Sequence, residues 1–276
     1  MWRMASLTGI GRIIGREPYF HKDCIFERSL DDFPEYMRRL RQITKEETQD
    51  EEITVDFGLC SETYECKCGD EDFKELRSVS EKYLIITGEY LQCYQWLEPI
   101  YEEIREIFNW SQQVREESRI MAENVFRSDK NHKLCVHNRR GDFIALGAES
   151  KMDFTVAAVE FVYFQIETFG NIYIPEFPGG SILEDQSFGS LECDSLLITA
   201  SSSTYSWWIG YLMRSAKNPS VGRIYYNSEF HVIYGYENFP PHWIPIKLKD
   251  GVIREDFSGL IVTKLTTRLS DTRMCN

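Results

Sequence analysis

The sequence has no excess of positive charge and no repeated or low-complexity segment. Its 276 residues include 31 lysines and arginines against 44 aspartates and glutamates, which gives a formal net charge of −13. Such a chain repels a phosphate backbone, and this excludes a general nucleic-acid binder. An anionic ligand would therefore have to be held locally, by particular arginines.

No targeting segment or membrane anchor is visible in the sequence. The first residues, Met1-Trp2-Arg3-Met4, lack the apolar core of a signal peptide. Leu196–Met213 is long enough to raise the question of a membrane span, but serines and threonines interrupt it. A strand, a turn and a helix explain this segment better.

The cysteines lack the spacing of a zinc site. Cys66-x-Cys68 has no matching Cys or His pair nearby, so disulfides of a secretory compartment or reduced structural thiols remain. The sequon at Asn109 agrees with that compartment and predicts a glycosylation site. Asp70-Glu71-Asp72 follows no apolar strand and is interpreted as a solvated turn rather than a metal site. The chain has eight cysteines in all, at positions 24, 60, 66, 68, 93, 135, 193 and 275.

The length allows two ordinary domains or one large α/β domain. The polar segment at 128–132 is the best candidate for a boundary and would give domains over 1–130 and 131–276. The first domain is expected to hold an acidic loop at 46–52, a strand at 83–88 and helices at 4–14, 30–43, 96–108 and 111–126. In the second domain, strands at 133–137, 171–174, 195–200 and 223–226 alternate with helices at about 153–168 and 205–214. This alternation predicts a parallel, Rossmann-type sheet, whose ligands bind beyond the carboxyl ends of the strands.

One such strand end has the sequence H-N-R-R-G-D-F, from His137 to Phe143. Arg139 and Arg140 are poor packing material here, but each offers a fork of donors that stays charged and matches phosphate geometry. Two interpretations are open. The motif is either a diphosphate clamp or a surface pair with one arginine salt-bridged to Asp142.

A second strand end, after Asp194 and an apolar run, has a series of hydroxylated residues. Ser201-Ser202-Ser203-Thr204 precedes Tyr205 and opens a helix. Free N–H groups at a helix N-terminus, their partial positive charge and the hydroxyls together suit an anion. Capping alone needs only one such residue. The run therefore favours a phosphate site, while Trp207 and Trp208 are interpreted as core residues.

Together these motifs resemble the α-1,2-fucosyltransferases (glycosyltransferase family 11), and most of all their divergent nematode members. The resemblance rests on H-x-R-R-G-D-F after a strand, followed further along the chain by S-S-S-T-Y-S-W-W. It covers nearly the whole chain, because three more stretches are similar: A-S-L-T-G-I-G-R at 5–12, I-T-G-E-Y-L-Q at 86–92 and F-P-P-H-W-I at 239–244.

The resemblance implies a GT-B-like fold in which two Rossmann-type lobes face a cleft. It also implies a GDP-fucose donor, inversion at the fucose carbon, and no required metal or other cofactor. The acceptor would be the 2-hydroxyl of a galactose-terminated glycan on the lumenal side of the Golgi membrane. Asp194 would hold the guanosine or orient the turn. The other donor-binding residues implied are His137, Arg139, Arg140, Ser202, Ser203, Thr204 and Tyr205.

The sequence departs from the family pattern at its start. Family members begin with a membrane anchor, a stem and a first strand that ends in a Gly-rich loop, whereas this sequence starts at or just before the helix that follows. We therefore expect an N-terminal lobe truncated at its first strand, a membrane link only through an absent anchor, and an intact C-terminal donor site.

The reaction implied needs charge neutralisation and a base. Arginines and N–H dipoles can stabilise the charge that departing GDP leaves on its β-phosphate without Mg²⁺. A carboxylate would take the acceptor's proton. Asp142, Glu149 and Asp153 are candidates, although Asp142 is rather expected to hold an arginine. A non-catalytic relative that binds a GDP-sugar or a glycan, and a transferase of different linkage, remain as alternatives.

Overall fold

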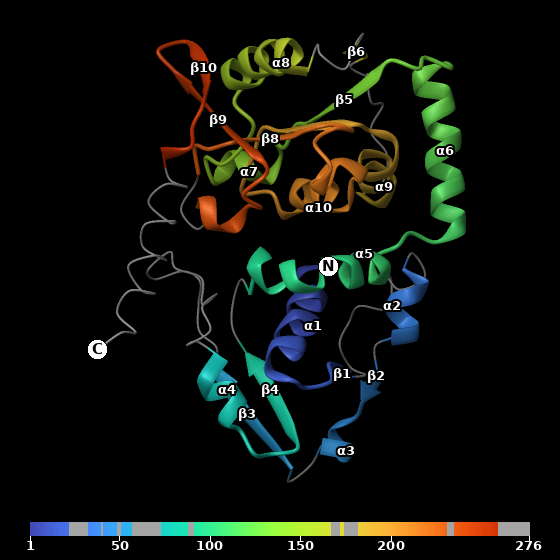
Figure 1. Ribbon diagram of the computed structural model, residues 1–276, viewed down its shortest axis with the longest axis vertical. Helices are drawn as coiled ribbons and strands as arrows, with labels where there is room; N and C mark the ends of the chain where they lie inside the picture. The colour runs from blue at the N-terminus through green and yellow to red at the C-terminus, as the bar shows by residue number, and fades with distance from the viewer. Residues whose placement is uncertain are drawn as a thin grey trace. The chain divides into compact units, whose positions relative to one another are not determined.

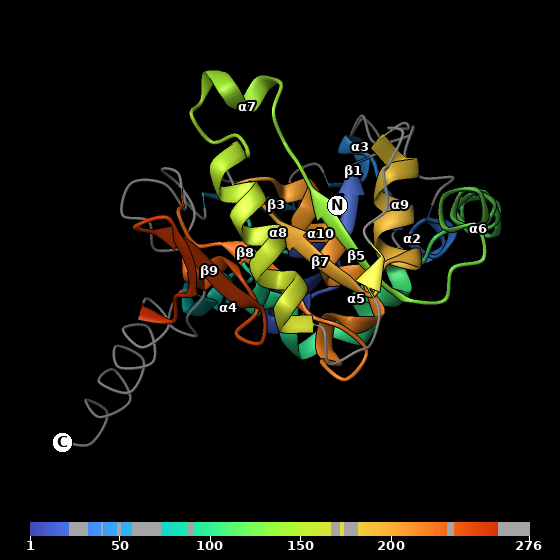
Figure 2. The same ribbon diagram turned by 90° about the horizontal axis from the view of Figure 1, so that it is seen from above.

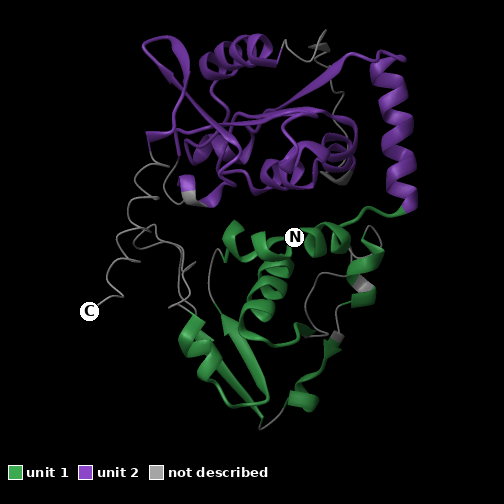
Figure 3. Ribbon diagram, viewed as in Figure 1, with its two compact units in different colours: residues 1–111 green, residues 112–276 purple. Residues whose placement is uncertain are grey.

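The computed structural model describes residues 1–21, 33–39, 41–48, 51–56, 73–87, 91–166, 172–173, 182–230 and 235–258. The chain divides into two compact units, residues 1–111 and 112–276 (Figure 3). Helix α6 (Gln112–Phe126), which the sequence places before the domain boundary, groups with the second unit because it packs on α9 (Ile182–Glu192).

The first unit contains two small parallel sheets among short helices. β1 (Tyr19–His21) pairs with β2 (Arg41–Ile43), and β3 (Glu52–Asp56) pairs with β4 (Tyr83–Thr87). The helices are α1 (Trp2–Ile14), α2 (Pro34–Arg39), α3 (Lys45–Thr48), α4 (Lys74–Ser78), η3 (Tyr94–Trp96), η4 (Glu98–Ile100) and α5 (Tyr101–Ile107).

The predicted helix at 4–14 and strand at 83–88 are confirmed over the described residues, but two other helices are corrected. Over 30–43 the described part is the short α2 and then a strand, because residues 41–43 pair with β1. Over 96–108 the helix is split into η3, η4 and α5, and Pro99 lies within η4. The acidic loop predicted at 46–52 instead contains most of α3 and the first residue of β3.

Helix α1 approaches its neighbours closely through glycine. A Cβ on Gly9 would lie 2.6 Å from the carbonyl oxygen of Trp96, so only glycine fits there. The Ser6 hydroxyl donates to the carbonyl of Leu91 at 2.6 Å. The helix ends at Gly15, whose φ of 72° is a left-handed conformation that favours glycine. The A-S-L-T-G-I-G-R stretch thus has a packing explanation.

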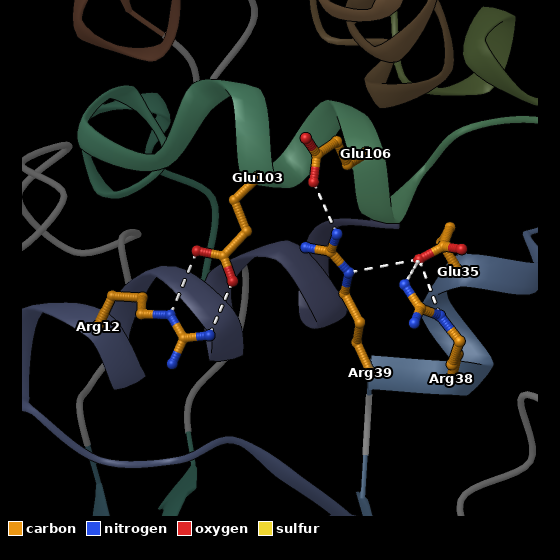
Figure 4. A network of polar contacts seen from close by, with 6 residues as sticks. All are labelled: Arg12, Glu35, Arg38, Arg39, Glu103 and Glu106. Atoms are coloured by element: carbon orange, nitrogen blue, oxygen red, sulfur yellow. Dashed lines mark hydrogen bonds and ion pairs between the residues drawn. The ribbon is translucent and has the colours of Figure 1, made fainter.

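Ion pairs connect α1, α2 and α5 (Figure 4). Arg12 donates to Glu103 from two nitrogens, Nε to Oε2 at 3.2 Å and Nη2 to Oε1 at 2.7 Å, and the hydrogen bond to Glu103 raises the pKa of Arg12. The basic residues of α2 are neutralised by neighbouring glutamates and offer no anion site. The network consists of Arg12, Glu35, Arg38, Arg39, Glu103 and Glu106.

The second unit is built on a six-stranded sheet of order β10-β9-β8-β7-β5-β6. All neighbours pair in parallel except β9 and β10, which are antiparallel. Helix α8 (Met152–Ile166) covers one face, and α9 and α10 (Thr204–Leu212) cover the other (Figure 1). The strands are β5 (His132–His137), β6 (Ile172–Tyr173), β7 (Ser195–Ile198), β8 (Ile224–Asn227), β9 (Ile244–Lys249) and β10 (Val252–Glu255).

The core of this unit follows from the sequence pattern. All four residues of β7 are buried, as expected of a strand covered on both faces. Helix α8 buries every fourth residue, Phe154, Ala158, Val162 and Ile166, against the sheet. The predicted α/β class is confirmed, and so is the strand, turn and helix within 196–213. None of the described helices is long and apolar enough to cross a membrane.

Two parts of this unit were not predicted. Helix α9 follows a Pro-Gly-Gly stretch in the sequence and contains Gly189, where a Cβ would lie 2.8 Å from Ile209. The β9–β10 hairpin turns at Asp250-Gly251, both with positive φ (53° and 76°), which is a sequence signal that could have identified it.

The disulfide interpretation is confirmed for the described cysteines. Cys135 of β5 is bonded to Cys193, with a Cα–Cα distance of 5.9 Å and 58 residues of sequence separation, and Cys93 is disulfide-bonded as well. The other cysteines and Asp70–Asp72 lie outside the described residues.

Removing this bond should loosen β5 and β7. We expect the double substitution Cys135→Ser/Cys193→Ser to lower the opening free energy of their amides by about 2–4 kcal/mol, since a loop of this length restricts the unfolded chain. Native-state hydrogen exchange measures that energy strand by strand. The β3–β4 amides of the first unit are the internal control. Unchanged exchange in β5 and β7 would contradict the prediction.

Candidate functional site

Two strand ends meet at the carboxyl edge of the second unit's sheet. In the parallel pairing of β5 with β7, His137 lies opposite Ile198, so the residues after each strand emerge side by side. The rings of His137 and Tyr205 lie 5.5 Å apart between centroids. The strand order, numbered along the chain from β5, is 2-1-3-4-5-6, and it reverses between β5 and β7. Sheets of this kind bind ligands at that point.

The arginine motif forms the turn after β5 and leads into α7 (Asp142–Ala145), which lies beyond the end of the strand (Figure 2). Gly141 has φ 49°, a conformation that favours glycine. Arg139 forms an ion pair with Asp142, with Nη2 2.9 Å from Oδ1, and its guanidinium lies 4.9 Å from the ring centre of Phe143. The Arg140 side chain is exposed and forms no hydrogen bond or ion pair with any described residue.

The geometry agrees in part with each interpretation of the motif, the surface pair and the diphosphate clamp. One arginine is salt-bridged to Asp142, as expected for a surface pair. The Asp142 side chain is 67% exposed, however, and exposed ion pairs contribute little free energy. An incoming oxyanion can therefore replace the carboxylate. The Nε of Arg139 is buried and has no hydrogen-bond partner among the described residues, which leaves a donor for such a ligand.

His137 is half-buried at the end of β5. Burial, followed by the charge of Arg139, lowers its pKa to about 4, so the imidazole is neutral at neutral pH. Its Nδ1 has no hydrogen-bond partner among the described residues. A neutral imidazole carries one N–H donor and one acceptor, and it can hydrogen-bond to a ligand without adding charge.

The hydroxyl-rich turn after β7 is only partly used by the fold. Ser201 donates to the carbonyl of Asn227. Ser203 is the N-cap of α10 but makes no side-chain capping bond. Within the described chain, the hydroxyls of Ser202, Ser203 and Thr204 have no protein partner, so capping does not explain the run. Burial raises the pKa of the Tyr205 phenol, which stays protonated as a donor.

The candidate bases are engaged with cations to different degrees. Glu149 pairs through Oε1 with Lys151 at 2.6 Å, and that hydrogen bond lowers the pKa of Glu149, to which the charge of Arg140 contributes. Its buried Oε2 has no partner among the described residues. Asp142 pairs with Arg139, and Asp153 accepts from the backbone N–H of Phe154.

Asp194 is not brought together with the other donor-binding candidates. It precedes β7 and so lies at the amino-terminal edge of the sheet, opposite the two turns. Its carboxylate accepts from the backbone N–H of Lys133 at 2.9 Å and from Arg214 at 3.1 Å. Of the two roles considered, only a local structural one fits this position.

The remaining expectations are less central to the site. Trp207 and Trp208 are each 2% exposed and belong to the core, as expected. Asn109 is exposed at the end of α5, where a glycan would have access to solvent. Among the described residues, no cluster of histidine, cysteine and carboxylate side chains is arranged to bind a metal.

Comparison with known proteins finds several similar nematode sequences. The chain is 28% identical over 189 residues to a Caenorhabditis elegans galactoside 2-alpha-L-fucosyltransferase, which covers 59% of the chain and 52% of that protein. It is 25% identical over 284 positions to the putative galactoside 2-alpha-L-fucosyltransferase svh-11 of the same organism, covering 90% of the chain and 75% of that protein. A third such enzyme is 26% identical over 230 residues.

The chain is a divergent relative of these nematode fucosyltransferases. It spans about half the length of the first of them (52%). No protein-family model and no solved structure matches it.

Two residues at the site of this fucosyltransferase relative were missed by the sequence reasoning. Ser150 and Thr199 are 2% and 0% exposed and lie between the two turns. They belong to no motif and are separated by 49 residues. Only the pairing of β5 with β7 brings them together, so no local signal identified them.

The lowered pKa of His137 predicts a pH-dependent stability. An unfolded histidine titrates near 6.5, so between pH 6.5 and about 4 the unfolded chain binds a proton that the folded chain does not. The contribution of the neutral His137 to the free energy of unfolding is therefore fully present above pH 6.5 and is lost as the pH falls toward 4. Urea unfolding should show a shallower fall in stability over this range for His137→Gln than for wild type. Parallel profiles for wild type and His137→Gln would contradict the assignment.

Proposed function

We propose that this protein is an inverting fucosyltransferase that moves L-fucose from GDP-fucose to the 2-hydroxyl of a terminal galactose on a glycan. One observation above all supports this proposal. Two arginines and a hydroxyl-rich helix N-terminus meet where the strand order reverses, in a chain related to galactoside 2-alpha-L-fucosyltransferases.

The diphosphate of the donor would lie between the two turns. Arg140, which is exposed, and Arg139, once its carboxylate is displaced, supply the bidentate donors that suit phosphate oxygens. The N-terminus of α10 adds backbone N–H groups and a partial positive charge. Neutral His137 and protonated Tyr205 add donors beside them. The hydroxyls of Ser202, Ser203 and Thr204, which have no partner among the described residues, lie at the N-terminus of that helix.

The reaction exchanges one carbon–oxygen bond for another. The bond between the fucose anomeric carbon and the β-phosphate oxygen breaks, and its electron pair leaves with GDP. The galactose 2-hydroxyl oxygen attacks the opposite face of that carbon, which inverts its configuration, and the hydroxyl proton passes to a carboxylate base. The arginines stabilise the charge on the leaving diphosphate, so the proposal requires no metal or other cofactor.

Glu149 fits the role of base better than Asp142. Its Oε2 has no partner among the described residues, whereas Asp142 is paired with the arginine that would bind phosphate. The lowered pKa of Glu149 keeps it ionised and able to accept a proton at neutral pH.

The wider setting is also part of the proposal. The doubly wound sheet of the second unit is what the donor-binding lobe of a GT-B-like enzyme would have, and we assign the acceptor side to the first unit. The Cys135–Cys193 disulfide suits an oxidising compartment such as the Golgi lumen.

A non-catalytic GDP-sugar-binding relative is the second candidate. It is favoured by the ion pairs that engage both Asp142 and Glu149, since each cation lowers the basicity of its partner. The two candidates share the diphosphate site and differ only in turnover.

Removing either arginine should weaken GDP binding. We expect Arg139→Ala and Arg140→Ala each to raise the Kd for GDP roughly 10- to 100-fold by calorimetry, because a charge-assisted hydrogen bond contributes about 1.5–3 kcal/mol. Arg119→Ala on α6, which also removes an exposed paired arginine of this unit, should leave the Kd unchanged. Wild-type affinity in both site variants would refute the clamp.

Turnover separates the two candidates. With GDP-fucose and a panel of β-galactosides, the wild type should release GDP and form a product fucosylated at the galactose 2-position. Glu149→Gln should retain GDP binding but lower kcat at least 100-fold, a typical effect of losing a general base. Asp142→Asn should retain most of the wild-type kcat. GDP binding without any turnover by the wild type would favour the non-catalytic candidate.

A further inference from the structure

Ser150 contacts the backbone of Arg139 on both sides. The Arg139 N–H donates to the Ser150 hydroxyl at 2.8 Å, and the Ser150 N–H donates to the Arg139 carbonyl at 2.7 Å. A single buried residue therefore satisfies both main-chain polar groups of the arginine. Because Ser150 lies eleven residues further along the chain, it closes the whole turn that carries Arg139 and Arg140.

Thr199 continues this contact into the neighbouring strand. Its hydroxyl lies 2.6 Å from the Ser150 hydroxyl and 2.6 Å from the carbonyl of His137. Thr199 is the residue that follows β7 and precedes the hydroxyl-rich turn. The two buried hydroxyls therefore connect the turn after β5 with the turn after β7.

Only one arrangement of hydrogens satisfies all of these contacts. The His137 carbonyl can only accept, so Thr199 must donate its single hydroxyl hydrogen there. Ser150 must then donate to Thr199, which leaves the Ser150 oxygen free to accept from the Arg139 N–H. The chain runs in one direction, from Arg139 through Ser150 and Thr199 to His137, and each hydroxyl donates once and accepts once.

We propose that Ser150 and Thr199 are positioning residues of the donor site, which fix the backbone of Arg139 against the hydroxyl-rich turn without touching the donor. The inference rests on the proposed function, because it concerns the same diphosphate site. Such a fully satisfied buried chain is rigid. Losing the Ser150 hydroxyl leaves the Arg139 N–H without its partner. Losing the Thr199 hydroxyl removes the acceptor of the Ser150 hydroxyl and leaves the His137 carbonyl with only the Thr199 N–H, at 3.4 Å. Either loss lets the arginine turn drift.

The test is the Kd for GDP, measured by calorimetry well below each variant's melting temperature. Thr199→Val keeps the side-chain shape and removes the hydroxyl, and we expect it to weaken GDP binding roughly tenfold. Thr199→Ser keeps the hydroxyl and should stay within about twofold of wild type. Ser150→Ala breaks the same chain at its other member and is the test if Thr199→Val does not fold.

Ser190→Ala is the matched control. Ser190 is also 2% exposed, and its hydroxyl donates to a backbone carbonyl, that of Ser187 at 3.1 Å, on α9. Its loss should lower the melting temperature to a similar degree and leave the Kd for GDP unchanged. A general loss of stability would instead affect all of these variants alike.

A double-mutant cycle shows whether the hydroxyls act through the arginine. In an Arg139→Ala background, Thr199→Val should weaken GDP binding by a smaller factor than in the wild type, because only Arg140 is left in the turn for it to position. An equal loss in both backgrounds would overturn the inference, and so would wild-type affinity in Thr199→Val. Failure of the wild type to bind GDP would instead refute the proposed function, and the positioning role with it.

Discussion

The parallel pairing of β5 with β7 is the constraint on which the second unit depends. Its register places His137 opposite Ile198, so both strands end at one level. From that level the chain leaves toward opposite sides of the sheet, through α8 to β6 and through α10 to β8. The Cys135–Cys193 bond joins β5 to the segment that enters β7. The backbone hydrogen bonds between β5 and β7 therefore position both turns of the proposed site.

The proposed diphosphate would complement the charges and donors of the site. In an acidic chain with a net charge of −13, the exposed Arg140 has no ion pair among the described residues. The helix that follows the neighbouring strand β7 adds the partial positive charge of its N-terminus. Three buried polar atoms of the site, Arg139 Nε, His137 Nδ1 and Glu149 Oε2, have no hydrogen-bond partner among the described residues. Each such group costs roughly 1–3 kcal/mol in a folded protein. Folding alone gives no reason to collect them in one place, whereas a bound diphosphate and its acceptor would satisfy them.

Residues at strand ends could be predicted from the sequence, and residues that meet through the fold could not. The alternation of strands and helices placed the arginine motif and the serine run at carboxyl ends, because each follows its own apolar strand. The role of Asp194 at the donor came from the family resemblance alone, and the residue lies at the other edge of the sheet because it precedes its strand. Helix α9 was missed because the Pro-Gly-Gly before it and Gly189 within it suggest turns. Gly189 is instead required by its contact with Ile209.

The hydroxyl chain shows how folding and the proposed chemistry depend on the same register. A one-residue slip of β7 against β5 would send every side chain to the opposite face. The side chain of Thr199 would then leave the His137 carbonyl, and Ser150 would lose its link to β7. The backbone pairing of β5 with β7 and the bond between Cys135 and Cys193 oppose such a slip. The covalent and backbone bonds that hold the two strands in register thus also fix, through two hydroxyls, where the arginine turn lies.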